Sequence, residues 1–153
     1  MSLRLQVAVD STAPAEAVWT VLTDWAGQSR WIPLTTVRVT AGPAQGVGGR
    51  VEALSGFWLG RVPVGLLDRF VVTGWTPPDR GYGELEVLHL GPYFTGEGAF
   101  RVTPTGTGCT ITATERFALP LGPVTEAPVR LLLPVMRRGF RGSLRALAAL
   151  AER

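Results

Sequence analysis

The chain contains one histidine, His89, and its position relative to Glu115 makes this pair the first candidate for chemistry. The segments 82–90 and 109–118 both alternate apolar and polar residues, and the two side chains fall on the apolar faces. Because alternate residues of a strand share one face, both are expected to point into the interior. A buried carboxylate is costly unless it is paired, and a histidine within reach would pair it. The pair could therefore act as a general acid and base in a pocket.

A structural role is the alternative for both residues. His89 and Glu115 each lie near the end of a predicted strand, where water or structural hydrogen bonds could satisfy them. A β-bulge would also turn either side chain to the opposite face. We therefore assign no catalytic residue from the sequence and treat both as candidates for contact with a ligand.

Aromatic and apolar side chains supply the remaining candidates for ligand contact. Phe57 and Trp58 lie in the irregular apolar segment 55–67, which could form a cavity rim, a lid or two strand ends. Tyr93, beside a turn, could offer a phenol to a polar group of a ligand. Ordinary packing is the alternative explanation for the apolar members. The complete set of candidate cavity residues is Phe57, Trp58, Val87, His89, Tyr93, Phe100, Glu115, Met136 and Phe140.

The elements that must position these residues begin with a strand over residues 3–9, followed by two short helices that Pro33 ends. The segment from Thr125 repeats apolar residues at intervals of three and four, which predicts a long amphipathic C-terminal helix. Pro134 predicts a kink in this helix, or a restart there. Between these ends, alternating runs are joined by turns rich in glycine and proline, which is typical of an antiparallel meander. The runs are 35–41, 49–57, 68–76, 82–90, 94–103 and 109–118.

Short motifs follow one another in a fixed order along nearly the whole chain. They are Val9-x-x-Thr12-x-Pro14-x-x-x-Val18-Trp19, Asp24-Trp25 with Arg30-Trp31-x-Pro33, Gly46-Val47-Gly48, Val72-Thr73-x-Trp75-x-Pro77-Pro78, Thr110-Ile111-Thr112-Ala113-Thr114-Glu115 and Leu144-x-x-Leu147. In this order they resemble the START-like, or SRPBCC, helix-grip superfamily, in its polyketide cyclase/dehydrase and lipid-transport branch.

The resemblance implies an α+β fold. A curved antiparallel sheet of six or seven strands would grip the long C-terminal helix, with two short helices after the first strand and a ligand cavity between sheet and helix. The superfamily contains enzymes, carriers and sensors, so the resemblance implies no single activity.

Length and composition indicate a single globular domain over residues 1–153. The chain is 46% hydrophobic and 18% charged, with a net charge of +3. One cysteine, Cys109, and one histidine leave no ligand set for zinc, and we expect no metal and no cofactor. No signal peptide is recognised, and no apolar run is long enough to span a bilayer. We therefore expect a soluble, cytoplasmic protein without membrane insertion.

The charge pattern bears on possible partners. All 15 cationic residues are arginines, and several fall together on the predicted C-terminal helix. This stripe is either a solvated surface or a docking site for an acidic protein partner or anionic lipid headgroups. We expect no nucleic acid partner, and a homodimer is left open. The stripe consists of Arg137, Arg138, Arg141 and Arg145.

The sequence as a whole favours a binding module. We expect it to hold a small, largely apolar molecule that is lipid-like, aromatic or polyketide-like. One alternative is a polyketide cyclase or dehydratase in which His89, Glu115 or a tyrosine moves protons. Another is a non-catalytic protein-interaction domain. Binding is preferred because few polar groups are expected to point inward.

Overall fold

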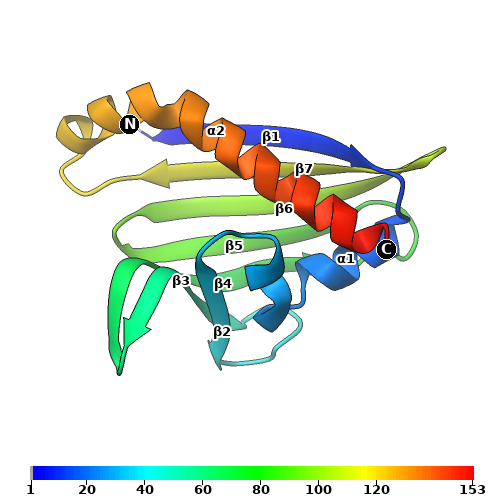
Figure 1. The fold of residues 1–153 in the computed structure, drawn as a ribbon, viewed down its shortest axis with the longest axis horizontal. Coiled ribbons are helices and arrows are strands. Elements are labelled where there is room, and N and C mark those ends of the chain that lie inside the picture. Colours follow the sequence, from blue (N-terminus) through cyan, green and yellow to red (C-terminus); the bar gives the residue numbers. More distant parts are fainter. Residues whose placement is uncertain (1) are drawn as a thin grey trace.

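Seven antiparallel strands form one continuous sheet in the order β1-β7-β6-β5-β4-β3-β2. The computed structural model describes residues 2–153. Figure 1 shows helix α2 lying across the sheet, with the short helices near its C-terminal end. The predicted helix-grip arrangement is therefore confirmed. The elements are β1 (Leu3–Ser11), α1 (Ala15–Leu22), the 3-10 helix η1 (Ala26–Arg30), β2 (Thr35–Ala41), β3 (Arg50–Leu59), β4 (Val62–Thr76), β5 (Gly83–Pro92), β6 (Thr95–Thr105), β7 (Gly108–Ala118) and α2 (Pro123–Ala151).

The main apolar core lies between the sheet and α2. Val87 on β5 and Ile111 on β7 are buried, and Leu144 and Leu147 of α2 belong to the same cluster and are fully buried. Residues that alternate with these on the strands, such as Glu86 and Thr112, line a hollow on the outer face. One face of the sheet is therefore covered by the helices and the other is polar, as the alternation predicts.

The two ends of α2 are held in different ways. After its C-terminal end, Glu152 accepts hydrogen bonds from Ser11 Oγ at 2.8 Å and from the backbone N–H of Thr12 at 3.0 Å. These bonds tie the end of the helix to the corner between β1 and α1. Toward the N-terminal end, Val129 packs on a smaller apolar cluster that includes Phe117 of β7. Among residues 2–153, no helix combines the length and apolarity needed to cross a membrane.

Helix α2 continues through both of its internal prolines. Pro128 and Pro134 lie inside the helix, which extends unbroken from Pro123 to Ala151. The predicted restart at Pro134 is therefore wrong. A proline removes one backbone hydrogen bond and disfavours a continuous helix. Here Leu133 and Phe140, on either side of Pro134, both pack on the apolar cluster of the sheet and hold the helix in place.

The irregular segment 55–67 forms the outer part of the β3–β4 hairpin, so two strand ends are the structure it adopts. Gly56 and Gly65 face each other in this hairpin with φ angles of 150° and 136°. A Cβ at either position would collide with a carbonyl oxygen of the facing strand. Only glycine suits both positions, and Figure 1 shows the tip beyond them projecting from the body of the protein.

Candidate functional site

His89 lies on the interior face of β5 and is held between two carboxylates. Its Nδ1 is 2.9 Å from Oδ1 of Asp68 on β4, and its Nε2 is 3.0 Å from Oε2 of Glu115 on β7. Only 7% of the histidine side chain is exposed. The positively charged imidazolium can donate to both oxygens at once, which the neutral ring cannot do. We refer to Asp68, His89 and Glu115 as the His89 cluster.

Strand β6 passes between His89 and Glu115, and it carries glycines where they meet. Gly96 pairs with His89 in the sheet register, and Gly98 pairs with Glu115. A Cβ on Gly98 would lie 2.7 Å from both carboxylate oxygens of Glu115. A bonded carbon cannot approach that closely without displacing the carboxylate. The missing side chain at position 98 therefore leaves the room that the contact across β6 requires.

Aromatic rings enclose the His89 cluster. The ring centroid of His89 is 4.9 Å from that of Phe94 and 5.8 Å from that of Phe70. Phe94 in turn lies 6.0 Å from Phe117. These rings cover much of the imidazole, and the apolar surroundings strengthen its electrostatic contacts.

Burial and the two neighbouring carboxylates shift the pKa of His89 in opposite directions. Burial alone would lower its pKa, but the hydrogen bonds and charges of Asp68 and Glu115 outweigh burial and raise the pKa from 6.5 to about 9. For Glu115, burial raises the pKa, and the hydrogen bond and charge of His89 offset only part of this effect. At neutral pH a proton donor therefore adjoins a carboxyl group of enhanced proton affinity, which suits a pair that exchanges protons.

Some of the cavity residues predicted from the sequence lie on the same interior face as this cluster. Val87, His89 and Glu115 are on the interior face, as their alternation indicated. Phe100 reaches the helix from β6, with its ring centroid 6.1 Å from that of Phe140 on α2. Contact of these residues with a ligand stays a prediction.

The other predicted cavity residues are exposed or lie on the projecting hairpin. Phe57, Tyr93 and Met136 are exposed. Trp58 lies on the projecting hairpin, and the Arg38 guanidinium sits over its ring at 4.6 Å from the ring centroid. Phe57 and Trp58 are separated from the cluster because the hairpin bends away from the sheet at Gly56 and Gly65.

Asp68 was not among the residues predicted from the sequence, although a signal for it exists. Asp68, Phe70 and Val72 alternate, and the last two are buried. This pattern places the carboxylate on the interior face. The contact itself depends on a register shift, because Phe70 pairs with His89 whereas Asp68 pairs with Pro92. Such an irregularity leaves no mark in the sequence.

Two further buried polar groups were also missed. Trp31 Nε1 and both carboxylate oxygens of Glu126 are buried and form no hydrogen bond within residues 2–153. Trp31 lies next to the ring of Phe100, at a centroid distance of 6.4 Å. Glu126 is in the first turn of α2. Neither residue has a sequence neighbourhood that distinguishes it from a packing tryptophan or a helix-terminal glutamate.

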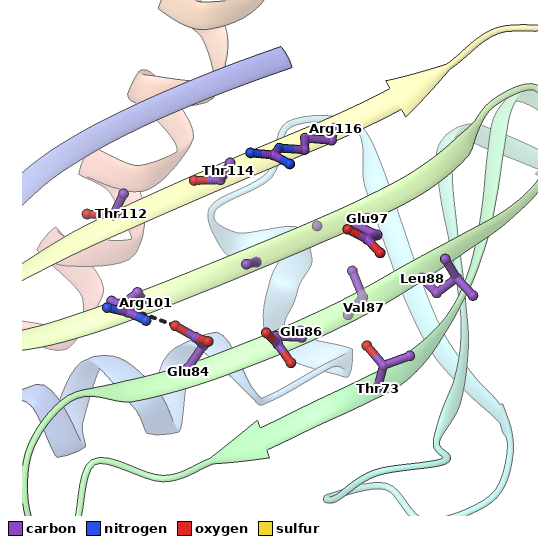
Figure 2. A pocket seen from close by; sticks show the side chains of 12 residues that line it. Thr73, Glu84, Glu86, Val87, Leu88, Glu97, Arg101, Thr112, Thr114 and Arg116 are labelled. Atoms are coloured by element: carbon purple, nitrogen blue, oxygen red, sulfur yellow. Dashed lines mark hydrogen bonds and ion pairs between the residues drawn. The ribbon is translucent and has the colours of Figure 1, made fainter. Parts of the chain in front are cut away.

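A polar hollow of about 590 Å³ lies on the opposite face of the sheet. Glu86, Glu97 and Arg116 are among its lining residues, and Figure 2 shows their side chains on the near side of the sheet with the helices behind. Glu84 and Arg101 form an ion pair there at 2.6 Å. This hollow is therefore distinct from the His89 cluster. Among residues 2–153, no cluster of side chains has metal-binding geometry.

The raised pKa of His89 predicts a stability that depends on pH. The histidine stabilises the fold fully below pH 6.5, and this contribution is lost as the pH rises through about 9, where the folded protein releases the proton. At about 1.4 kcal/mol per pKa unit, the loss is at most about 3 kcal/mol. Urea unfolding measured between pH 6.5 and 9 should show it in the wild type and not in His89→Gln. If the free energy of unfolding changed with pH equally in the two proteins, the ion pairing of His89 would be contradicted.

The substitution Gly98→Ala should displace the Glu115 carboxylate and lower the free energy of unfolding by about 1–3 kcal/mol. Gly106→Ala, in the turn between β6 and β7, is the matched control because no atom would lie within 4 Å of the new Cβ. Chemical denaturation of both variants measures the difference. If the two substitutions lower the free energy of unfolding equally, the absence of a side chain at position 98 does not matter for the placement of Glu115.

Comparisons with known proteins agree with this fold. Among solved structures, the Zhui aromatase/cyclase of Streptomyces is 19% identical, with a TM-score of 0.72 over 100% of this chain and 95% of that chain. A protein from Thermus thermophilus is 18% identical, with a TM-score of 0.69 over 99% and 97% of the two chains. A norcoclaurine synthase point mutant from Thalictrum is 16% identical, with a TM-score of 0.67 over 99% and 94%.

At these identities the solved structures establish a shared fold and not a shared activity. Comparison with functionally curated proteins gives no match. A family model described as polyketide cyclase / dehydrase and lipid transport matches residues 2–152. Because this match covers almost the whole chain and the fold agrees with it, the chain belongs to the polyketide cyclase/dehydrase and lipid transport family.

Proposed function

We propose that the protein binds a small, largely apolar molecule between the sheet and α2, with the His89 cluster contacting its polar group. One observation carries the proposal. Asp68 and Glu115 each use one carboxylate oxygen to hold His89, and their side chains remain 19% and 18% exposed. Within residues 2–153 the second oxygen of each forms no hydrogen bond, so both can accept one from a ligand.

Aromatic side chains would supply most of the contact area. Phe94, Phe100 and Phe140 belong to the apolar clusters on the interior side and are only half-buried, so part of each side chain stays accessible. Burying roughly 300 Å² of apolar ligand surface at about 25 cal/mol per Å² gives about 7 kcal/mol before the costs of association. Micromolar binding corresponds to about 8 kcal/mol, so the polar contacts at the His89 cluster must contribute as well.

The polar groups define the chemistry of the expected ligand. Two carboxylates around one imidazolium leave an excess of acceptor oxygens, which a hydroxyl or amine of the ligand would satisfy. Trp31 Nε1, a buried donor without a hydrogen bond within residues 2–153, could serve an oxygen of the ligand. We therefore expect an aromatic or polyketide-like molecule that carries at least one hydrogen-bond donor.

A second candidate function is acid–base catalysis on the bound molecule. It is favoured by the distance of 3.0 Å between His89 Nε2 and Glu115 Oε2 and by the raised pKa of both residues. The Zhui protein, which shares the fold, is named as an aromatase/cyclase, and we propose a related type of activity for this chain.

The chemistry would be loss of water from a β-hydroxy ketone. The Glu115 carboxylate would take a proton from the carbon beside the carbonyl, and the His89 imidazolium would protonate the hydroxyl. This hydroxyl leaves as water while the C=C bond forms. A proton passing from Glu115 to His89 then restores both charges. A binding protein would return 4-hydroxy-4-phenylbutan-2-one unchanged, whereas an enzyme would convert it to the conjugated enone.

The proposed binding site can be tested with N-phenyl-1-naphthylamine, an apolar aromatic dye with one N–H group whose fluorescence rises in apolar surroundings. We expect Glu115→Gln to weaken dye binding about fivefold, because a charged acceptor is lost. Glu97→Gln is the matched control, since it changes a carboxylate that lines the hollow on the outer face. Titration by fluorescence measures both affinities.

Two results of the titration would contradict the proposal. One is unchanged affinity in Glu115→Gln when circular dichroism shows that the variant is folded. The other is a greater loss in Glu97→Gln, which would place the dye in the outer hollow. Phe140→Ala gives a second test from the helix side, and it should weaken binding without altering either carboxylate.

A further inference from the structure

We propose that the protein docks on the surface of a bilayer that contains anionic lipids, through two apolar edges at one end of the sheet. The first edge is the tip of the β3–β4 hairpin, residues 57–64. The second is the outward face of the N-terminal half of α2, residues 124–136. The proposal does not depend on which molecule the interior binds.

The hairpin tip exposes apolar side chains that the fold holds away from the core. Phe57, Leu59 and Val62 are 60%, 68% and 60% exposed. Single exposed apolar residues are ordinary on a protein surface, but a projecting group of them marks an interaction site. The facing glycines, Gly56 and Gly65, allow the bend that directs this group outward.

The N-terminal half of α2 is apolar on both of its sides. Val129 and Leu133 pack against the sheet. Leu131 and Val135, one helical turn apart, are 82% and 69% exposed, and Leu132 beside them is also exposed. A helix on a water-facing surface normally carries polar residues on its outer side. The outward face of this half therefore fits an apolar or interfacial environment.

Both edges lie at the same end of the sheet. In the antiparallel meander β3, β5 and β7 all end there, and β7 leads directly into α2. Figure 1 shows the β3–β4 tip and the N-terminal half of α2 at one end, with the β5–β6 turn between them. Two separate projecting edges suit a broad, deformable surface better than a single peptide or helix, which would need a continuous groove.

The exposed charged residues of the two edges are arginines, and the one acidic residue within them, Glu126, is buried. Residues 53–67 contain Arg61 and no acidic residue, and residues 127–151 contain only arginines as charged residues. Arginines beside exposed apolar side chains are the composition of segments that lie in the interface of anionic membranes. A second copy of the chain would bring like charges together, which disfavours a homodimer through these edges. The arginines of the second range are Arg130, Arg137, Arg138, Arg141 and Arg145.

Flotation with lipid vesicles tests the proposal. Vesicles of phosphatidylcholine and phosphatidylglycerol in equal amounts should carry the wild-type protein, and vesicles of phosphatidylcholine alone should carry less. The double substitutions Leu59→Ser with Val62→Ser, and Leu131→Ser with Val135→Ser, should each weaken binding about tenfold, because apolar side chains leave the interface. Val47→Ser is the matched control, since Val47 is equally exposed in the β2–β3 connection at the opposite end.

Arginine variants test the electrostatic part separately. Arg61→Ser should weaken binding to the anionic vesicles about fivefold and leave binding to neutral vesicles unchanged. Arg80→Ser, in the connection between β4 and β5 at the other end of the sheet, should have no effect. The wild-type protein can also be tested directly. Vesicles with brominated acyl chains should quench part of its tryptophan fluorescence, because Trp58 lies in the hairpin tip.

Several outcomes would overturn the proposal. The first is failure of the wild type to float with the anionic vesicles. The second is loss of binding in Arg61→Ser with no loss in the two serine double variants, which would indicate electrostatic attraction of the kind an acidic protein provides. The third is a dimer in sedimentation experiments that the hairpin substitutions dissociate, because the apolar edges would then belong to an interface between two copies.

Discussion

A buried imidazolium held by two carboxylates is the interaction on which the rest of the candidate site depends. A charge inside an apolar protein is tolerated only when partners surround it, and removing one partner leaves the others uncompensated. The contacts of His89 with Asp68 and Glu115 require β4, β5 and β7 in one register, with a glycine on β6 between them. The strands around His89 and the rings of Phe70 and Phe94 leave only 7% of the histidine side chain exposed.

The interior divides into two regions with different properties. Around Leu144 and Leu147 the C-terminal half of α2 is sealed against the sheet, and the bonds of Glu152 to the β1–α1 corner hold it there. Around the His89 cluster the rings are half-buried and two carboxylates remain partly exposed. The first region gives the fold its stability, whereas the second has the unsatisfied polar groups and accessible apolar surface that a ligand would need.

Much of this arrangement could be predicted from alternation along the strands. The periodicity of two placed His89 and Glu115 on the interior face and separated Glu84 and Glu86 from them, because a pleated strand obeys this rule locally. The position of Asp68 opposite His89 could not be predicted, since it depends on a bulge between strands. Nor could the projection of Phe57 and Trp58, because it depends on two facing glycines whose pairing becomes visible only in the folded hairpin.

The most direct measurement is the titration of the single histidine by nuclear magnetic resonance. Because His89 is the only histidine in the chain, its ring resonances do not overlap with those of another histidine. With both carboxylates in contact, the pKa of His89 should be about 9, so the ring stays protonated well above pH 6.5. A midpoint near the ordinary value of 6.5 would show that the two carboxylates do not hold a buried cation, and it would contradict the proposed site.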